Sequence, residues 1–301
     1  HSFQDESQIL KIKHKNIIKH IRLNLIGKIQ VKNILMAFIA AEKSGLNLNK
    51  ILNVLPSLKP IEGRFEKIGM IKNKSKVILD YAHTPDALKT CLLNLKEQFP
   101  DKKIISLFGC GGNRDQNKRS KMGKIADIFS DEIYLTDDNP RFESSHKIRK
   151  DIRTGIKKTK VIEISDRGKA IAQAIKNLRT GEILLVAGKG HEKVQNIGKR
   201  KIFFSDKKII LESIKTKNHS LSNNLKLNII REVSGNKKFP FSLKLKQARI
   251  NSKEVKKDDI FFAIKGNKND GNKFISQSFK NKASLAVVNK IQKKLKIHNQ
   301  I

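Results

Sequence analysis

Between Val77 and Phe204, short apolar runs alternate with stretches whose apolar residues recur at helical spacing. This alternation is typical of βαβ units, and it predicts an α/β fold with a Rossmann-like, mainly parallel sheet. The expected strands are Lys76–Asp80, Ile104–Phe108, Ile133–Thr136, Val161–Ile164 and Ile183–Ala187.

Two of the intervening helices have recognisable starts. Thr84 supplies an N-cap, Pro85 follows at the first helical position, and Asp86 adds an acid to the first turn. Asp166 is the expected N-cap of a second helix, whose apolar residues Ala170 to Leu178 fall on one face. Both patterns predict crossover helices that face the core.

The chain on either side has a different pattern. We expect a buried helix over Val31 to Ala41, a second helix over Leu46 to Leu55 that Pro56 ends, and a linker over Ser57 to Gly63. Residues 215–224 are polar and are predicted to be another linker. A small α/β unit is expected beyond it, with strands near Ala248–Ser252, Ile260–Ile264 and Ala283–Val288 and a helix over Phe274–Phe279.

Composition limits the classes of function. The net charge of +36 is typical of a protein that binds nucleic acid or an anionic surface. The lysines, however, are spread over nearly every segment beside Ile and Asn, aromatic residues are 6% of the chain, and Trp is absent. We therefore attribute the charge to a Lys/Ile/Asn-biased proteome and expect no nucleic-acid partner, while a basic non-catalytic nucleic-acid-binding module is the alternative hypothesis.

Cysteine and apolar content favour a cytoplasmic protein. Cys91 and Cys110 lack metal-ligand spacing, and we expect both to be reduced thiols, with no disulfide and no metal site. The longest apolar run, Ile34 to Ala41, is far shorter than the roughly twenty residues that span a bilayer. Because the chain begins at His1 without a signal or transit pattern, we expect a fragment of a longer cytoplasmic protein.

Four polar clusters directly follow predicted strands. In an open parallel sheet these positions share the carboxyl edge, where ligands bind. The clusters begin at Asp80, Gly109, Asp137 and Gly188. Four such clusters in one domain indicate a binding site rather than unrelated turns.

The same residues resemble the C-terminal domain of MurE-type ligases in the Mur ligase family, over about residues 20 to 214. The motifs that match in order are Gly63-Arg64-Phe65-Glu66, Asp80 to Leu88, Phe108 to Asp115, Thr136 to Arg141 and Gly188-Lys189-Gly190-His191-Glu192. The resemblance implies an ATP- and Mg²⁺-dependent enzyme that adds meso-diaminopimelate to UDP-MurNAc-L-Ala-D-Glu. In that reaction an acyl phosphate forms on the D-glutamyl carboxylate, and the incoming amine displaces phosphate. No macromolecular or membrane partner is implied, and we expect a monomer.

Diaminopimelate presents a carboxylate and an ammonium at its unreactive end, so its site needs a cation beside an anion. Arginine suits the carboxylate because its planar fork donates two parallel hydrogen bonds. Arg114 and Arg141 are the candidates, and Glu192 with the Gly188 backbone is expected to take the ammonium. By resemblance, Asp138, Asn139, Pro140 and Arg141 form the diaminopimelate-recognition motif. A lysine substrate would leave Arg141 unpaired.

The resemblance also implies ATP-binding residues. Arg64 and His83 are expected near the phosphates, and Asp80 at the ribose or adenine edge. At adenine, Asn33 matches the second of two family asparagines, and Gln30 replaces the first. The chain has no G-x-x-x-x-G-K-[ST] loop, and Gly188-Lys189-Gly190 does not form one, since the spacing is wrong and no Ser or Thr follows. With the Mg²⁺ ligands expected mostly outside this chain and no catalytic residue assigned, we expect the 301-residue chain to be inactive.

The last segment resembles another part of the same family. Residues 249–266, followed by Asp270-Gly271, are similar to the N-terminal UDP-muramoyl-binding domain of a Mur ligase, with Asn251-Ser252-Lys253 at the usual Asp-Ser-Arg and Ser252 as the UDP-sugar candidate. The order of domains favours a MurF-type successor, although MurE-type domains share the motif. The expected domains are 1–58 (tail of a central ATPase domain), 59–214 (C-terminal domain), 215–224 (linker) and 225–301 (truncated MurF-like domain). Either a MurE–MurF fusion or two merged reading frames would produce this order.

Overall fold

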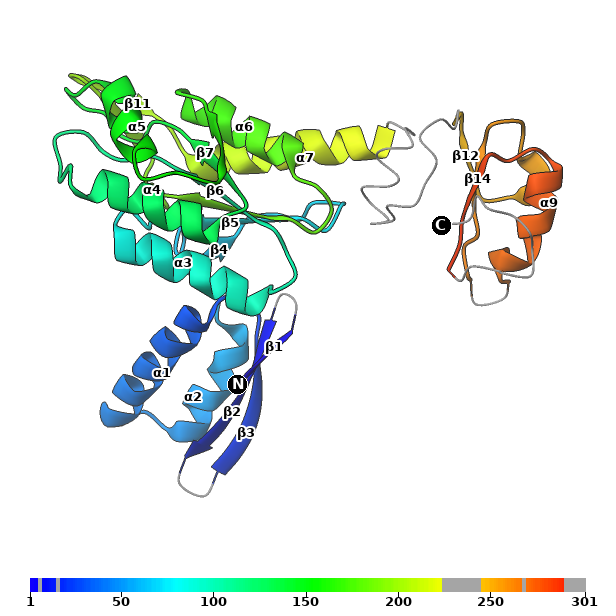
Figure 1. Cartoon of the computed structure of the whole chain (residues 1–301). Helices are drawn as coiled ribbons and strands as arrows, with labels where there is room; N and C mark the ends of the chain where they lie inside the picture. The colour runs from blue at the N-terminus through cyan, green and yellow to red at the C-terminus, as the bar shows by residue number, and fades with distance from the viewer. Residues whose placement is uncertain (5–6, 15–16, 224–244, 267–268, 290–301) are drawn as a thin grey trace. The chain divides into compact units, whose positions relative to one another are not determined.

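The computed structural model describes residues 1–4, 7–14, 17–223, 245–266 and 269–289 (Figure 1). The chain divides into two compact units. One comprises His1–Ile71 with Ser75–Lys215, and the other comprises Lys72–Lys74 with residues from Thr216 onward.

A six-stranded sheet forms the centre of the first unit. Its order is β4-β5-β9-β6-β7-β8, and all neighbouring strands are parallel except β4, which pairs antiparallel with β5. The strands are β4 (Glu66–Lys67), β5 (Lys76–Asp80), β6 (Ile104–Phe108), β7 (Glu132–Leu135), β8 (Lys160–Glu163) and β9 (Ile183–Ala187). The predicted parallel sheet is confirmed, and β7 and β8 begin one residue earlier than expected.

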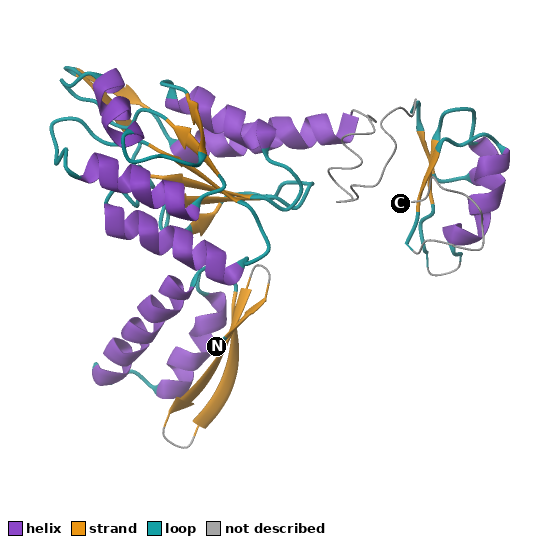
Figure 2. Ribbon diagram, in the orientation of Figure 1, coloured by secondary structure: helices purple, strands orange, loops and turns teal. Residues whose placement is uncertain are grey.

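Helices cover both faces of this sheet (Figures 1 and 2). The helices are α3 (Pro85–Gln98), α4 (Lys118–Phe129), α5 (Ser145–Arg153), α6 (Arg167–Asn177) and α7 (Asp206–Asn223). Side chains of α3, α4 and α5 share one buried cluster with alternate residues of β9, namely Ile183, Leu185 and Ala187. The predicted N-caps are confirmed, because the Thr84 side chain accepts from the Ala87 N–H and the Asp166 side chain from the Lys169 N–H.

The first 58 residues contain a sheet that we did not predict. Strands β1 (Ser2–Gln4), β2 (Ser7–His14) and β3 (Ile17–Leu23) are antiparallel. They share a buried cluster with α1 (Lys28–Lys43) and α2 (Leu48–Val54). The alternating Lys and Ile residues, which we attributed to compositional bias, are a period-two strand pattern with one face buried.

The helix expected over Val31 to Ala41 exists within α1, but it is buried on one side only. Phe38 is buried, whereas Met36 is 71% exposed and Ile39 is 53% exposed. The prediction of a buried helix was therefore wrong for the face that carries Met36 and Ile39.

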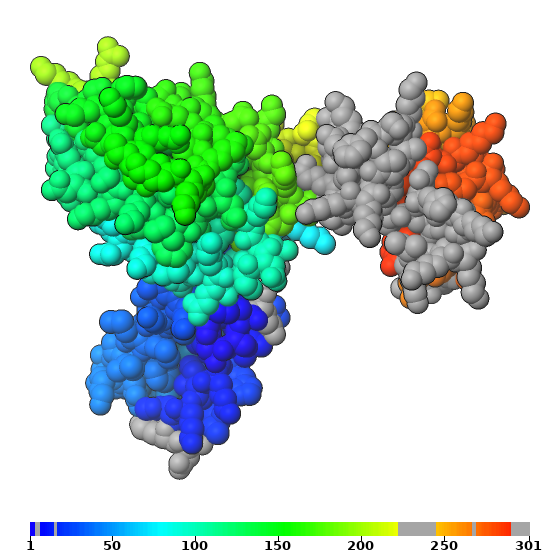
Figure 3. Space-filling view, viewed as in Figure 1, coloured from blue at the N-terminus to red at the C-terminus, as the bar shows by residue number. Residues whose placement is uncertain are grey.

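Side-chain hydrogen bonds join the start of α1 to α3. Gln98 accepts from the Gly27 N–H at 2.6 Å, and Asn94 accepts from the Ile29 N–H at 2.9 Å. The two regions are also adjacent in Figures 1 and 3, where α3 is cyan and α1 is blue. These bonds satisfy N–H groups at the start of α1, which has no side-chain N-cap.

The predicted linker over 215–224 is wrong in its conformation. Residues 215–223 continue α7, and residue 224 lies outside the described residues. No Gly or Pro interrupts Asp206 to Asn223. A helix that is already nucleated extends through polar residues at about 0.7 kcal/mol each or less, so low apolar content does not end it.

The second unit contains a three-stranded parallel sheet in the order β12-β13-β14. Its elements are β12 (Ala248–Arg249), β13 (Ile260–Phe262), α9 (Ile275–Lys280) and β14 (Leu285–Val287). Val255, Phe261 and Ile275 contribute to its buried cluster. The small α/β unit is confirmed here, while 225–244 and 290–301 lie outside the described residues.

Candidate functional site

The four polar clusters meet because β9, the last strand of the six-stranded sheet in sequence order, lies between β5 and β6. The strands that precede the clusters are therefore consecutive in the order β5-β9-β6-β7. Their carboxyl ends share one edge of the sheet, as the sequence predicted.

A cavity of about 360 Å³ opens at this edge. It contains most of the predicted diaminopimelate residues together with His83, which we had placed on the ATP side. Its lining includes Tyr81, His83, Gly111, Arg114, Asp115, Lys118, Asp138, Asn139, Arg141, Gly188 and Glu192. Pro140, which is also buried, is not among its lining residues.

Glycine allows the 109–112 loop to contact the 136–141 loop directly. A Cβ on Gly112 would lie 1.9 Å from the Pro140 carbonyl oxygen, and one on Gly109 would lie 2.2 Å from that of Thr136. Any larger residue would separate the loops that carry Arg114 and Arg141.

Arg141 is held in an unusual backbone conformation at the cavity. Its φ is 54°, in the left-handed region that few non-glycine residues adopt. Its N–H donates to the Asn196 carbonyl at 3.0 Å, and the Gly198 N–H donates to the Arg141 carbonyl at 2.6 Å. One guanidinium nitrogen donates to the Gly112 carbonyl at 2.9 Å and more weakly to that of Asn139. Among the described residues, none accepts a hydrogen bond from its other two guanidinium nitrogens.

Asp138 supplies a carboxylate in the same cavity. The residue is 7% exposed, and its carbonyl accepts from the Gln195 side chain. No described residue donates a hydrogen bond to its carboxylate. A Cβ on Gly188 would lie 2.8 Å from Asp138 Oδ2, so glycine leaves room for this carboxylate.

Glu192 is more heavily engaged than we expected. Its Oε2 accepts from Lys189 at 2.9 Å and from Asn139 at 3.0 Å, and its Oε1 accepts from the Tyr81 hydroxyl at 3.2 Å. Burial by itself raises the pKa of Glu192, but these hydrogen bonds outweigh burial and lower the pKa below its usual value. Glu192 is therefore held as a carboxylate by Lys189 and Tyr81, two residues that we had not assigned to the site.

A second cavity, of about 460 Å³, contains three of the four predicted ATP-binding residues. Asn33, Arg64 and Asp80 line it with Gln30 and with the apolar side chains of Ile29, Ile61, Phe65 and Ala87. Amide groups beside apolar walls suit a flat heteroaromatic base. The Gln30 amide also donates to the Arg64 carbonyl at 2.9 Å, so it orients the loop that carries Arg64.

Asp80 organises the wall of this second cavity. Its two carboxylate oxygens accept from the Phe65 and Ala82 N–H groups, each at 2.7 Å. Burial raises the pKa of Asp80 above its usual value, although these bonds and the Cys91 thiol oppose the shift. Much of its acceptor capacity is therefore used by the protein itself.

Tyr81 connects residues of the two cavities. The Arg64 guanidinium lies 4.7 Å from the centre of the Tyr81 ring, while the Tyr81 hydroxyl donates to Glu192. The Tyr81 and His83 rings also meet edge-on, with their centres 4.7 Å apart. In the sequence Tyr81 lies between Asp80 and His83, which are both predicted site residues. That position was the signal by which Tyr81 could have been assigned to the site.

Three further predictions concern features outside these cavities. The described part of the chain has no group of three or more His, Cys, Asp or Glu residues able to hold a metal ion. Ser252, the UDP-sugar candidate, is 5% exposed, and its hydroxyl donates to the Gln277 side chain at 3.5 Å. Within the described ranges, no helix combines the length and apolarity needed to cross a membrane.

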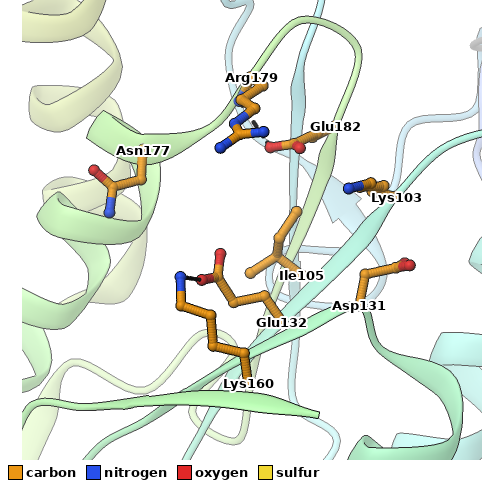
Figure 4. Close-up of a pocket in the computed structure, with 8 residues that line it drawn as sticks. All are labelled: Lys103, Ile105, Asp131, Glu132, Lys160, Asn177, Arg179 and Glu182. Carbon is orange, nitrogen blue, oxygen red and sulfur yellow. Dashed lines mark hydrogen bonds and ion pairs between the residues drawn. The ribbon is translucent and has the colours of Figure 1, made fainter.

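A third cavity, of about 370 Å³, lies at the opposite, amino edge of the sheet (Figure 4). Most of its lining residues are charged, and some of them pair with one another. Lys160 contacts Glu132 at 2.5 Å, and the Glu182 carboxylate accepts from the Arg179 N–H at 2.7 Å. No sequence motif falls at this edge, so its residues are suitable controls for substitutions at the carboxyl edge.

Comparison with known proteins identifies the domain that contains the first cavity. Residues 63–190 match the family described as Mur ligase, glutamate ligase domain. The UDP-N-acetylmuramoyl-L-alanyl-D-glutamate--2,6-diaminopimelate ligase of Rickettsia felis is 44% identical over 188 residues, which cover 62% of this chain and 35% of that protein. The ligase of the same name from Leptospira interrogans is 44% identical over 190 residues, with 62% and 37% covered. The chain thus spans little more than a third of these relatives.

Solved structures agree. A ligase structure of the same name shares 34% sequence identity at a TM-score of 0.54, covering 67% of this chain and 41% of that one. The MurF ligase of Thermotoga maritima, solved in complex with ADP, matches at a TM-score of 0.50 with 17% identity, over 72% and 45% of the two chains, and so shares the fold. Residues 63–190 therefore match the C-terminal domain of Mur ligases in sequence and in fold.

Proposed function

We propose that this chain is part of an ATP-dependent ligase that adds meso-diaminopimelate to UDP-MurNAc-L-Ala-D-Glu. The cavity at the carboxyl edge supports the substrate, because it offers a cation and an anion that the protein leaves incompletely paired. Arg141 has two guanidinium nitrogens without a described acceptor, and Asp138 has a carboxylate without a described donor. This pair complements the amino-acid end of diaminopimelate that does not react.

The second cavity supports ATP as the co-substrate. Its apolar walls and the amides of Gln30 and Asn33 suit adenine, and Arg64 provides a cation for phosphate. In the proposed reaction a D-glutamyl carboxylate oxygen bonds to the γ-phosphorus of ATP and ADP leaves. The diaminopimelate amine then bonds to the acyl carbon, phosphate leaves, and the amine loses a proton. Mg²⁺ would be held mostly by residues outside this chain.

The C-terminal unit is proposed to be the start of a MurF-like UDP-muramoyl-binding domain. Its parallel β12-β13-β14 sheet and its buried Ser252 support that assignment. We favour a MurE–MurF fusion over two merged reading frames, and the mass of the native protein distinguishes them.

Calorimetric titration of the 301-residue chain tests the proposed amino-acid site. Meso-diaminopimelate should bind at least about tenfold more tightly than L-lysine. Lysine lacks the distal carboxylate, so it cannot form the charge-assisted hydrogen bonds with Arg141. Arg141→Ala should remove this preference by weakening diaminopimelate binding. Arg179→Ala, which deletes an arginine at the amino edge, is the matched control and should leave both affinities unchanged.

Equal affinity for the two amino acids would refute diaminopimelate as the substrate. Tight, salt-sensitive DNA binding without a response to diaminopimelate would instead favour the basic nucleic-acid-binding module.

A further inference from the structure

Lys189 carries a fully buried side chain at the carboxyl edge of the sheet. The sequence gives it no role, because Gly188-Lys189-Gly190 lacks the spacing of a phosphate-binding loop. Burying an ammonium is unfavourable unless its donors are paired. The partners of Lys189 therefore indicate what the charge does.

All three N–H donors of Lys189 have an acceptor. Nζ lies 3.1 Å from Asn139 Oδ1, 2.9 Å from Glu192 Oε2 and 2.8 Å from the Val194 carbonyl oxygen. A lysine ammonium has three donors, so none remains for a ligand. Lys189 thus acts on a ligand only through the residues that it holds.

Two of those residues line the cavity assigned to diaminopimelate. A carboxylate offers about four acceptor positions. On Glu192, Lys189 and Asn139 use two positions at Oε2, and Tyr81 uses one at Oε1. One position at Oε1 therefore stays available to an ammonium donor in the cavity.

Asn139 is fixed by the same contact. Its Oδ1 accepts from Lys189 and from the Asn196 N–H at 3.0 Å, which directs its amide nitrogen to Glu192. Without the Lys189 ammonium, Glu192 would lose its only ion-pair partner among the described residues. The Glu192 side chain, which is 31% exposed, would then be free to turn toward solvent.

We propose that Lys189 is a positioning residue for amino-acid binding, whose buried ammonium holds Glu192 and Asn139 so that Glu192 Oε1 and the Asp138 carboxylate together receive the ligand ammonium. The identity of the ligand as diaminopimelate rests on the function proposed above. The contact between Lys189 and Glu192 does not depend on that identity.

Lys189→Met, which keeps most of the length of the side chain and removes its charge, tests the proposal in the 301-residue chain. At pH 7 diaminopimelate binding should weaken about tenfold to a hundredfold, as expected when a charged hydrogen-bonding partner is removed. The pKa of Glu192 should rise in the variant, so its binding should also decline as the pH falls from 8 to 5, where the unmodified protein keeps its affinity. Lys160→Met, which removes one ion-paired ammonium at the amino edge, is the control and should change neither property.

NMR titration of ¹³C-labelled glutamate gives a readout that needs no ligand. The Glu192 carboxyl, assigned by its loss in Glu192→Gln, should titrate at higher pH in Lys189→Met than in the unmodified protein. If the unmodified protein does not bind diaminopimelate, the proposed function fails while this titration still tests the role of Lys189.

A folded Lys189→Met variant with unchanged diaminopimelate affinity and unchanged Glu192 titration would overturn the proposal. If the variant does not fold, the Lys189 ¹⁵Nζ resonance of the unmodified protein decides. It should shift as diaminopimelate saturates the site while that of Lys160 does not, and the absence of a shift would refute the proposal.

Discussion

At the residue scale, a buried arginine supports the loop that carries Arg114. Arg119 has a fully buried side chain, and it donates to both carboxylate oxygens of Glu143 at 2.6 and 2.7 Å. It also contacts Asp151 at 2.9 Å and the Gly111 carbonyl at 3.4 Å. Glu143 in turn accepts from the Asn113 N–H at 3.1 Å. This ion pair therefore connects α4 to the glycine-containing loop of the site.

The Arg119–Glu143 pair should make stability depend on acid pH. Hydrogen bonds from Arg119 lower the pKa of Glu143 from 4.5 to about 2. Because the pKa is lower in the folded protein, the stabilisation is complete above pH 4.5 and is lost as the pH falls toward 2. Glu143→Gln should reduce the free energy of unfolding by about 1.5–3 kcal/mol at pH 7. Urea unfolding from pH 7 downward should show this difference narrowing below pH 4.5.

The exposed pair of Glu97 with Lys28 supplies the comparison. Glu97→Gln should change stability by less than about 1 kcal/mol. If Glu143→Gln lowers the free energy of unfolding by the same amount over the whole pH range, the charge of Glu143 does not provide the stabilisation.

At the element scale, a hairpin and a glycine-rich loop enclose the motif of residues 138–141. Strands β10 (Val194–Ile197) and β11 (Arg200–Phe203) form an antiparallel pair. Gln195 and Asn196 of this hairpin donate to Asp138 and Asn139. On the other side, the Gly112 N–H donates to the Asn139 carbonyl at 2.9 Å. The left-handed backbone of Arg141 is thus set by elements on both sides of it.

Gly112→Ala should disturb this arrangement. The new Cβ would overlap the Pro140 carbonyl, so one loop has to move, at a cost of about 1–3 kcal/mol of unfolding free energy. Diaminopimelate affinity should fall as well, because Pro140 precedes Arg141. Thermal unfolding and calorimetric titration measure the two effects.

Gly168→Ala in α6 is the control for that substitution. Its Cβ would meet only side-chain atoms, at 3.3 Å or more, and alanine favours the helix. The interpretation of Gly112 is wrong if both alanine variants are equally stable and bind diaminopimelate equally.

At the scale of the whole molecule, the chain contains the proposed amino-acid and nucleotide sites but lacks the sequence pattern of a phosphate-binding loop. No G-x-x-x-x-G-K-[ST] pattern occurs in its 301 residues. Such a loop surrounds the phosphates with N–H groups, and Arg64 alone does not replace it.

We therefore expect the purified 301-residue chain to form no tripeptide. Phosphate release should stay at background with ATP, Mg²⁺, UDP-MurNAc-L-Ala-D-Glu and diaminopimelate all present. The ligase of Rickettsia felis, assayed in parallel, confirms that the reagents are competent. Sustained ATP-dependent tripeptide formation by this chain would show that it contains a phosphate site of another kind.

The sequence alone determined the features that depend on local interactions. The strands Lys76–Asp80, Ile104–Phe108 and Ile183–Ala187 follow from short apolar runs, and the caps at Thr84 and Asp166 follow from bonds within one turn. The motif residues at the carboxyl edge were likewise visible, because each cluster directly follows its strand.

Only the tertiary structure decided which of those clusters touch. The position of β9 between β5 and β6 is a long-range pairing, and it brings Glu192 to the Tyr81 hydroxyl. The same packing buries Lys189 and directs its ammonium to Asn139, fifty residues away. Local patterns cannot specify such contacts, since burial and pairing depend on how distant segments fill a common core and satisfy one another's polar groups.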